Sequence, residues 1–139
     1  MGIRFFVGHG ASGSAASMAP HVEGLRRRGI EAEAIDLPLK KAEAAVVAMR
    51  SIVPDRPGPD GTLIAVGGQS YGGRVASLAA AEPDTDYAGL VLFSYPLHAP
   101  GAPDRATEPW AASEPAPLPC AAVALAVLLS TPRAADREN

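Results

Sequence analysis

Residues 62–76 have the sequence TLIAVGGQSYGGRVA, and this stretch decides the fold. The apolar run Thr62 to Val66 predicts a buried strand, and the small residues Gly73 to Ala81 predict a helix that packs tightly on a sheet. Between the two, Ser70 has a glycine two residues away on either side, Gly68 and Gly72. A strand that turns sharply into a helix strains the residue at the turn and needs neighbours without a Cβ atom. We therefore expect an exposed Ser70 hydroxyl at a helix N-terminus.

Strands and helices alternate on both sides of this stretch. Gly29 follows three arginines and predicts the end of the first helix. The alternation predicts βαβ units, and hence an α/β fold: a parallel sheet with helices on both faces, in three layers. The other predicted strands are residues 3–7, 30–35 and 90–93, and the other predicted helices are residues 14–28 and 39–53.

The character of the chain changes after Ala99, where prolines interrupt a segment rich in alanine. No convincing β-α-β continuation follows, so we expect an α/β core over residues 1–105, truncated after its fourth strand, and an irregular Pro/Ala-rich tail over residues 106–139. Only the apolar run 121–129 could form an element there, and its period does not decide between a strand and a short helix at 120–129. An apolar last strand would be an exposed edge, which predicts a homodimer through that edge unless this run covers it.

Composition limits the partners and the location of the protein. The chain has 139 residues and a net charge of −3 with no basic block, so neither nucleic acid nor an anionic membrane is an expected partner. Cys120 is the only cysteine, and the three histidines are scattered without ligand spacing, so we expect no metal and no cofactor. The chain starts without a secretory pattern, and its longest apolar run is shorter than the ~20 residues that span a bilayer. A cytoplasmic location is therefore expected.

A second glycine-rich segment, Gly8-His9-Gly10-Ala11-Ser12-Gly13, follows the first predicted strand and has two interpretations. In an acyl-transfer enzyme, a His-Gly loop at this place supplies an N–H donor from Gly10 or Ala11 to the oxyanion, opposite the N–H of Tyr71. The same segment also fits the G-x-G-x-x-G pattern of a dinucleotide site, with Asp36 placed to bind a ribose. The first interpretation is favoured because the second leaves the surroundings of Ser70 unexplained. A P-loop is excluded, since Gly73-Arg74 stands where that motif needs Lys-Ser/Thr.

A third segment, residues 94–100, follows the fourth predicted strand. The carboxyl ends of parallel strands meet at one edge of a sheet, so this segment is expected to form a wall of the same pocket. His98 within it has two interpretations, either a solvated loop histidine or a catalytic base.

Together these residues resemble the α/β-hydrolase superfamily, and especially its small bacterial dienelactone-hydrolase-like proteins. The resemblance covers residues 1–105, and its most specific parts are the turn around Ser70 and the Tyr-Pro-Leu-His sequence of residues 95–98. It implies that Ser70 is the nucleophile of a serine hydrolase, and that the N–H groups of Tyr71 and of the Gly10–Ala11 turn stabilise the oxyanion. A small ester, thioester or lactone is the expected substrate, because the loops are short and leave no room for a lid. The matching segments are residues 8–13, 36–38, 68–76 and 95–98.

The chain departs from this family after His98. The family carries a triad acid after the next strand and a catalytic histidine after the one following it. Here the remaining 139 − 98 = 41 residues contain no histidine, and aspartate occurs among them only at Asp104 and Asp136. A serine hydroxyl is a poor nucleophile until a base removes its proton. Three interpretations therefore stand: a truncated or frame-shifted product, a pseudo-hydrolase that binds a ligand or a partner, or a hydrolase in which His98, oriented by an acid such as Asp104, serves as the base.

Overall fold

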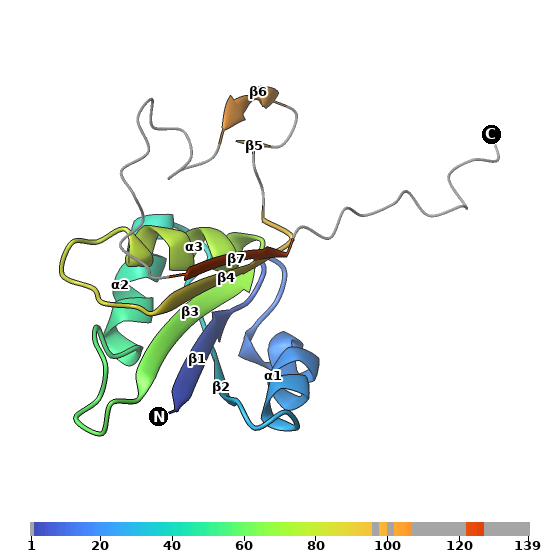
Figure 1. The fold of residues 1–139 in the computed structure, drawn as a ribbon. Helices are drawn as coiled ribbons and strands as arrows, with labels where there is room; N and C mark the ends of the chain where they lie inside the picture. Colours follow the sequence, from blue (N-terminus) through green and yellow to red (C-terminus); the bar gives the residue numbers. More distant parts are fainter. Residues whose placement is uncertain (1, 96–97, 100–101, 107–121, 127–139) are drawn as a thin grey trace.

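Five parallel strands form the central sheet of the computed structural model, which describes residues 2–95, 98–99, 102–106 and 122–126 (Figure 1). The strand order is β2-β1-β3-β4-β7, so β1 and β3 lie at the centre. The expected α/β class is confirmed. The strands are β1 (Ile3–Gly8), β2 (Glu31–Ile35), β3 (Leu63–Gln69), β4 (Gly89–Phe93) and β7 (Ala122–Ala126).

One strand of this sheet comes from the expected tail. Strand β7 runs parallel to β4, with Gly89 opposite Ala122 and Phe93 opposite Ala126. The short helix that the sequence allowed at 120–129 is therefore wrong for the five described residues, and the sheet continues past its fourth strand. The reason lies in pairing, since β4 offers a row of free backbone groups that a short apolar run can satisfy as a strand. Among the described strands the sheet ends at β2 and β7 rather than at β4.

Helices cover both faces of the sheet, as expected. The 3-10 turn η1 (Ala15–Met18) and helix α1 (Ala19–Arg26) lie on one face, while α2 (Ala42–Ile52) and α3 (Tyr71–Ala80) lie on the other (Figure 1). Successive side chains of a strand point to opposite faces. Phe5 and Val7 accordingly pack with Met18 on the α1 side, and Phe6 packs with Val75 on the α3 side.

The first predicted helix is split and ends early. Residues 15–18 form the 3-10 turn, Pro20 stands at the start of α1, and α1 ends at Arg26. Gly29 has φ +79°, which confirms it as the left-handed residue that redirects the chain into β2.

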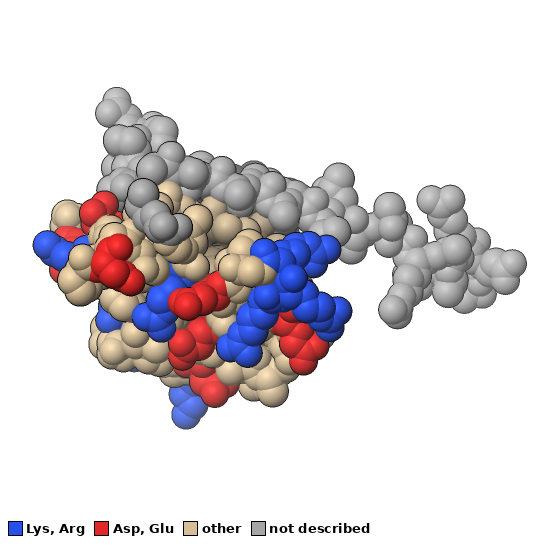
Figure 2. All heavy atoms as spheres, turned by 60° about the horizontal axis from the view of Figure 1, so that its bottom comes forward, with Lys and Arg blue, Asp and Glu red and all other residues tan. Residues whose placement is uncertain are grey.

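Charged side chains of both signs lie together on the face of the molecule that Figure 2 shows. The ion pairs include Arg27 with Glu23 at 3.5 Å and Arg50 with Asp84 at 2.6 Å.

Beyond β4, a two-stranded antiparallel ladder lies outside the main sheet (Figure 1). It pairs β5 (His98–Ala99) with β6 (Ala102–Ala106).

Candidate active site

Ser70 lies between the end of β3 and the start of α3, at the carboxyl edge of the sheet. Its backbone has φ 49° and ψ −110°, a combination that residues with a Cβ atom rarely adopt. Two hydrogen bonds hold it there: the Ser70 N–H donates to the Phe93 carbonyl at 2.8 Å, and the Ser70 carbonyl accepts the Arg74 N–H at 3.0 Å. The strained turn expected from the sequence is present.

The glycines around Ser70 are required by close backbone contacts. A Cβ atom on Gly68 would lie 2.6 Å from both the Gly72 carbonyl oxygen and the Gly73 nitrogen. A Cβ atom on Gly72 would lie 2.6 Å from the His9 carbonyl oxygen and would also overlap the backbone of Gly8. Gly72 therefore does more than shape the elbow (residues 68–72), because it lets α3 approach the glycine loop (residues 8–13) that follows β1.

A cavity of about 510 Å³ opens at the elbow and the glycine loop. Ser70 and Gln69 line it from the elbow, and Gly10 and Ala11 line it from the glycine loop. The structure thus brings together the nucleophile candidate and the loop expected to supply an oxyanion donor. Ser12, Gly13 and Ser17 complete the lining.

Tyr71 supplies the N–H group next to the serine. It is the first residue of α3, and the first N–H groups of a helix have no acceptor within the helix. The positive end of the helix dipole favours negative charge at this point. The Tyr71 side chain points elsewhere: its hydroxyl donates to the Pro38 carbonyl at 2.6 Å, and burial raises the pKa of this hydroxyl.

His9 has contacts that the sequence does not predict. The imidazole is only 2% exposed. Its Nε2 accepts the Leu37 N–H at 2.9 Å, and its Nδ1 lies 2.8 Å from the Gly10 carbonyl oxygen. The ring therefore links the glycine loop to the segment after β2, 28 residues away in sequence. The only sequence signal was the His-Gly pair directly after a strand.

Asp36 has a structural contact in place of the ribose contact of the dinucleotide interpretation. Its Oδ1 accepts the Ala15 N–H at 2.8 Å, at the start of η1. A bound dinucleotide would place its phosphate at the free N–H groups of a helix start. Here the Asp36 carboxylate already accepts the Ala15 N–H at that place.

The other two histidines have different surroundings. His98 lies in β5, opposite Ala106 of β6. The ring of His21 contacts that of Phe93 at 5.4 Å between centroids, with the ring planes tilted by 56°. Neither His9 nor His21, the histidines whose side chains the structure describes, is hydrogen-bonded to the Ser70 hydroxyl.

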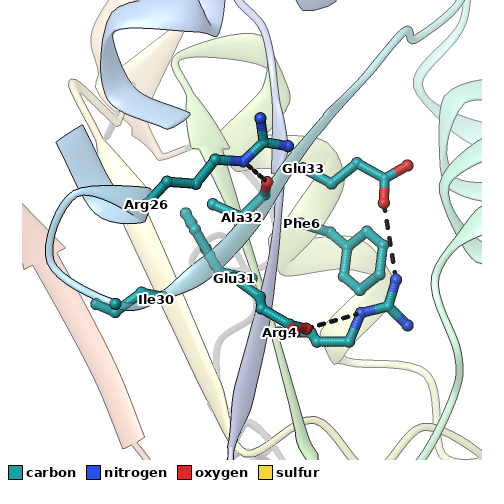
Figure 3. Close-up of a pocket in the computed structure, with 9 residues that line it drawn as sticks. Arg4, Phe6, Arg26, Ile30, Glu31, Ala32 and Glu33 are labelled. Atoms are coloured by element: carbon teal, nitrogen blue, oxygen red, sulfur yellow. Dashed lines mark hydrogen bonds and ion pairs between the residues drawn. The ribbon is translucent and has the colours of Figure 1, made fainter. Parts of the chain in front are cut away.

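A second cavity, of about 520 Å³, lies against β1 and β2 (Figure 3). Arg4 forms ion pairs there with Glu31 at 3.6 Å and with Glu33 at 3.7 Å. Arg26 donates from Nε to the Ala32 carbonyl at 3.0 Å. These charged groups are engaged with protein partners, and no glycine-rich motif reaches this cavity. The cavity at Ser70 is therefore the candidate active site.

Within the described ranges, no three His, Cys, Asp or Glu side chains are arranged to hold a metal ion. No helix in those ranges has both the length and the apolarity to cross a membrane.

Comparison with known proteins places this geometry in a family. A family model described as an alpha/beta hydrolase domain matches residues 5–120. The chain therefore belongs to the α/β-hydrolase family. No curated protein matches the chain significantly.

Solved structures with the same fold include one of the metagenome-derived lipolytic enzymes LipS and LipT, with 24% identity and a TM-score of 0.54. A PytH variant carrying a histidine-to-alanine substitution has 23% identity and a TM-score of 0.57. The alignments cover 73% and 71% of this chain, but 45% and 42% of the two neighbours. The chain thus spans less than half the length of each.

Proposed function

We propose that this chain is a serine hydrolase-type protein of the dienelactone-hydrolase-like group, with Ser70 as its nucleophile. The observation that carries the proposal is the φ of 49° at Ser70, held between a strand and a helix N-terminus. A strained backbone of this kind is characteristic of functional sites, because the surrounding structure must maintain it against its cost.

The reaction that fits is acyl transfer to the Ser70 hydroxyl. Attack of Oγ on an ester carbonyl, with loss of the hydroxyl proton to solvent water or a base, would make a tetrahedral oxyanion that the N–H groups of Tyr71 and Ala11 stabilise. Collapse of the oxyanion breaks the ester C–O bond, the alcohol leaves with a proton, and water then hydrolyses the acyl-serine to the acid and free Ser70. The cavity at Ser70, about 510 Å³ in volume, suits a small ester, thioester or lactone. This proposal requires no metal and no cofactor.

Ester hydrolysis tests the proposal. The wild-type chain should release p-nitrophenol from p-nitrophenyl acetate, and Ser70→Ala should lower the rate of release at least about 10²-fold. Ser12→Ala is the matched control, because Ser12 lines the same cavity but lies in the glycine loop. A hydrolysis rate equal in wild type and Ser70→Ala, or lost equally in Ser12→Ala, would contradict the assignment of Ser70.

A second candidate function is ligand binding without turnover. It is favoured because neither His9 nor His21 is hydrogen-bonded to Ser70, and an unactivated serine reacts slowly. In that case the folded protein would hydrolyse no ester, yet a stable phosphonate analogue of an ester would raise its Tm. Ser70→Trp, which fills the cavity, should abolish that shift.

We also propose a cytoplasmic location and a homodimer through a free sheet edge. The described sheet ends at β2 and β7. Arg26 already occupies the Ala32 carbonyl of β2, which leaves that edge with one backbone acceptor fewer for a partner strand. Light scattering that gives only the monomer mass at high protein concentration would contradict the dimer.

A further inference from the structure

We propose that His9 is a positioning residue, which holds the Gly10–Ala11 peptide so that its N–H group faces the Ser70 cavity. This inference deepens the function proposed for Ser70 and rests on it. The His9 ring is buried and does not itself line the cavity. It would therefore act on the reaction only through the peptide that it holds.

The hydrogen bonds of the ring fix its proton. The Leu37 N–H can only donate, so the Nε2 atom that accepts it at 2.9 Å carries no proton. The Nδ1 atom must then carry the proton that bonds to the Gly10 carbonyl at 2.8 Å. The imidazole is thus held as the neutral Nδ1–H form, with both nitrogens engaged.

The Gly10 carbonyl is held from two sides. It accepts Nδ1–H of His9 at 2.8 Å and the Gly13 N–H at 3.0 Å, which uses both lone pairs of the oxygen. A trans peptide is planar, so its N–H points away from its C=O. Fixing the Gly10 carbonyl on the protein side therefore turns the Ala11 N–H outward, and among the described residues that N–H has no acceptor.

The opposite orientation would harm the reaction. If the Gly10–Ala11 peptide rotated, its carbonyl oxygen would face the cavity and repel a developing oxyanion. Glycine at position 10 does not prevent this by itself, because even a Cβ atom there would meet only the Gln69 carbonyl oxygen, at 3.9 Å. The His9 bond supplies the restraint that the glycine lacks.

The segment after β2 anchors the ring and the elbow together. Three consecutive residues each hold a different part of the site: Asp36 accepts the Ala15 N–H, Leu37 donates to His9, and Pro38 accepts the Tyr71 hydroxyl. The glycine loop and the elbow are thus both hydrogen-bonded to one short segment. A shift of the Ala11 or Tyr71 N–H group relative to Ser70 would strain one of these bonds.

Two substitutions of His9 separate the positioning role from a purely structural one. The amide nitrogen of asparagine falls near the Nδ1 position, so His9→Asn can keep the bond to Gly10. The amide of glutamine falls near the Nε2 position, so His9→Gln can keep the bond to Leu37 and loses the one to Gly10. Each variant loses one of the two bonds, so a structural role predicts similar behaviour of the two.

The readout is the rate at which a fluorophosphonate modifies Ser70, together with NMR of the imidazole and of the Gly10 carbonyl. We expect His9→Asn to react within about 3-fold of wild type and His9→Gln to react at least about 10-fold more slowly, approaching the ~10²–10³-fold loss of a whole oxyanion donor. The imidazole ¹⁵N shifts of wild type should report the Nδ1–H form. Equal rates in the two variants, or a wild-type ring with its proton on Nε2, would overturn the inference.

Failure of the proposed function gives a different pattern. If wild type does not react with the fluorophosphonate at all, the nucleophile assignment fails. The NMR data then still test the positioning role of His9. A His9 ring with its proton on Nδ1, and a Gly10 ¹³C=O shift that changes in His9→Gln but not in His9→Asn, would support that role. A Gly10 shift that moves in both variants or in neither contradicts it.

Discussion

Replacing Ser70 by glycine should stabilise the protein relative to replacing it by alanine. Both substitutions remove the hydroxyl, so the comparison isolates the backbone. At an ordinary position glycine is less stable than alanine by about 0.5–1 kcal/mol, because it loses more conformational freedom on folding. At Ser70 the φ of 49° and ψ of −110° impose strain on any residue with a Cβ atom, and glycine relieves it.

The structure sets the expected size of this inversion. A sparsely populated backbone conformation costs about 1–3 kcal/mol. After subtraction of the glycine entropy term, Ser70→Gly should be more stable than Ser70→Ala by about 1 kcal/mol. Urea unfolding followed by circular dichroism measures this difference as a higher midpoint at unchanged slope.

A matched pair in α2 gives the control. Val47 is 70% exposed and lies in the middle of that helix. There Val47→Gly should be less stable than Val47→Ala by about 1 kcal/mol, the normal order. If Ser70→Gly is also the less stable of its pair, the backbone at Ser70 is unstrained and the elbow assignment is wrong.

Three other substitutions test the contacts around the site and the surface. Gly72→Ala should cost at least about 3 kcal/mol of unfolding free energy, because the new Cβ atom would overlap backbone that cannot move aside. The control is Gly24→Ala, whose Cβ atom meets only Arg28 Nη1 at 3.8 Å and which should be neutral or stabilising. Equal thermal midpoints for the two variants would contradict the close approach of Gly72 to Gly8 and His9. Asp36→Ala should lower the unfolding free energy by about 1 kcal/mol, because the Ala15 N–H loses its acceptor, whereas the amide oxygen of Asp36→Asn can still accept it. Equal losses in urea unfolding would mean that this hydrogen bond contributes nothing. The hydrogen bond from Arg50 lowers the pKa of Asp84 in the folded state. The Asp84 carboxylate therefore stabilises the folded protein at pH values above its unfolded-state pKa, and this stabilisation is lost as the pH falls through the lower folded-state pKa. Asp84→Asn should therefore flatten the fall of Tm between about pH 5 and about pH 2, and an unchanged slope would show that the pair is not formed in solution.

The parts of the fold that the sequence predicted are those with local signals. The strand before Ser70 is an apolar run, and the turn itself is fixed by glycines two residues away on either side. The steric role of Gly68 follows from contacts with Gly72 and Gly73, within a few residues of chain, whereas that of Gly72 depends on the distant Gly8 and His9. The C-terminal signal of Gly29 is equally local, and its φ of +79° agrees with it.

The parts that the sequence could not predict depend on distant pairing. Strand β7 forms because β4 offers a partner edge, and an Ala-Val-Ala-Leu-Ala segment carries no helix or strand period of its own. The role of His9 depends on Leu37, and that of Asp36 on Ala15. A histidine between two glycines in a loop gives no sign that it is buried and doubly bonded.

The question of activation also depends on distant residues. The sequence predicts His98 at the carboxyl edge of the sheet by strand order, and the structure describes its backbone within the β5–β6 ladder. Because the chain spans less than half the length of its structural neighbours, the activation of Ser70 stays a prediction, which the ester assay tests.

The central claim is that Ser70 is the reacting group of this site. Peptide mapping by mass spectrometry after treatment with a fluorophosphonate tests it directly. The account predicts one phosphonyl adduct per chain, located on Ser70, and no adduct in a folded Ser70→Ala variant. An adduct on Ser12 or Ser17, or a folded wild-type chain that remains unmodified, would contradict it.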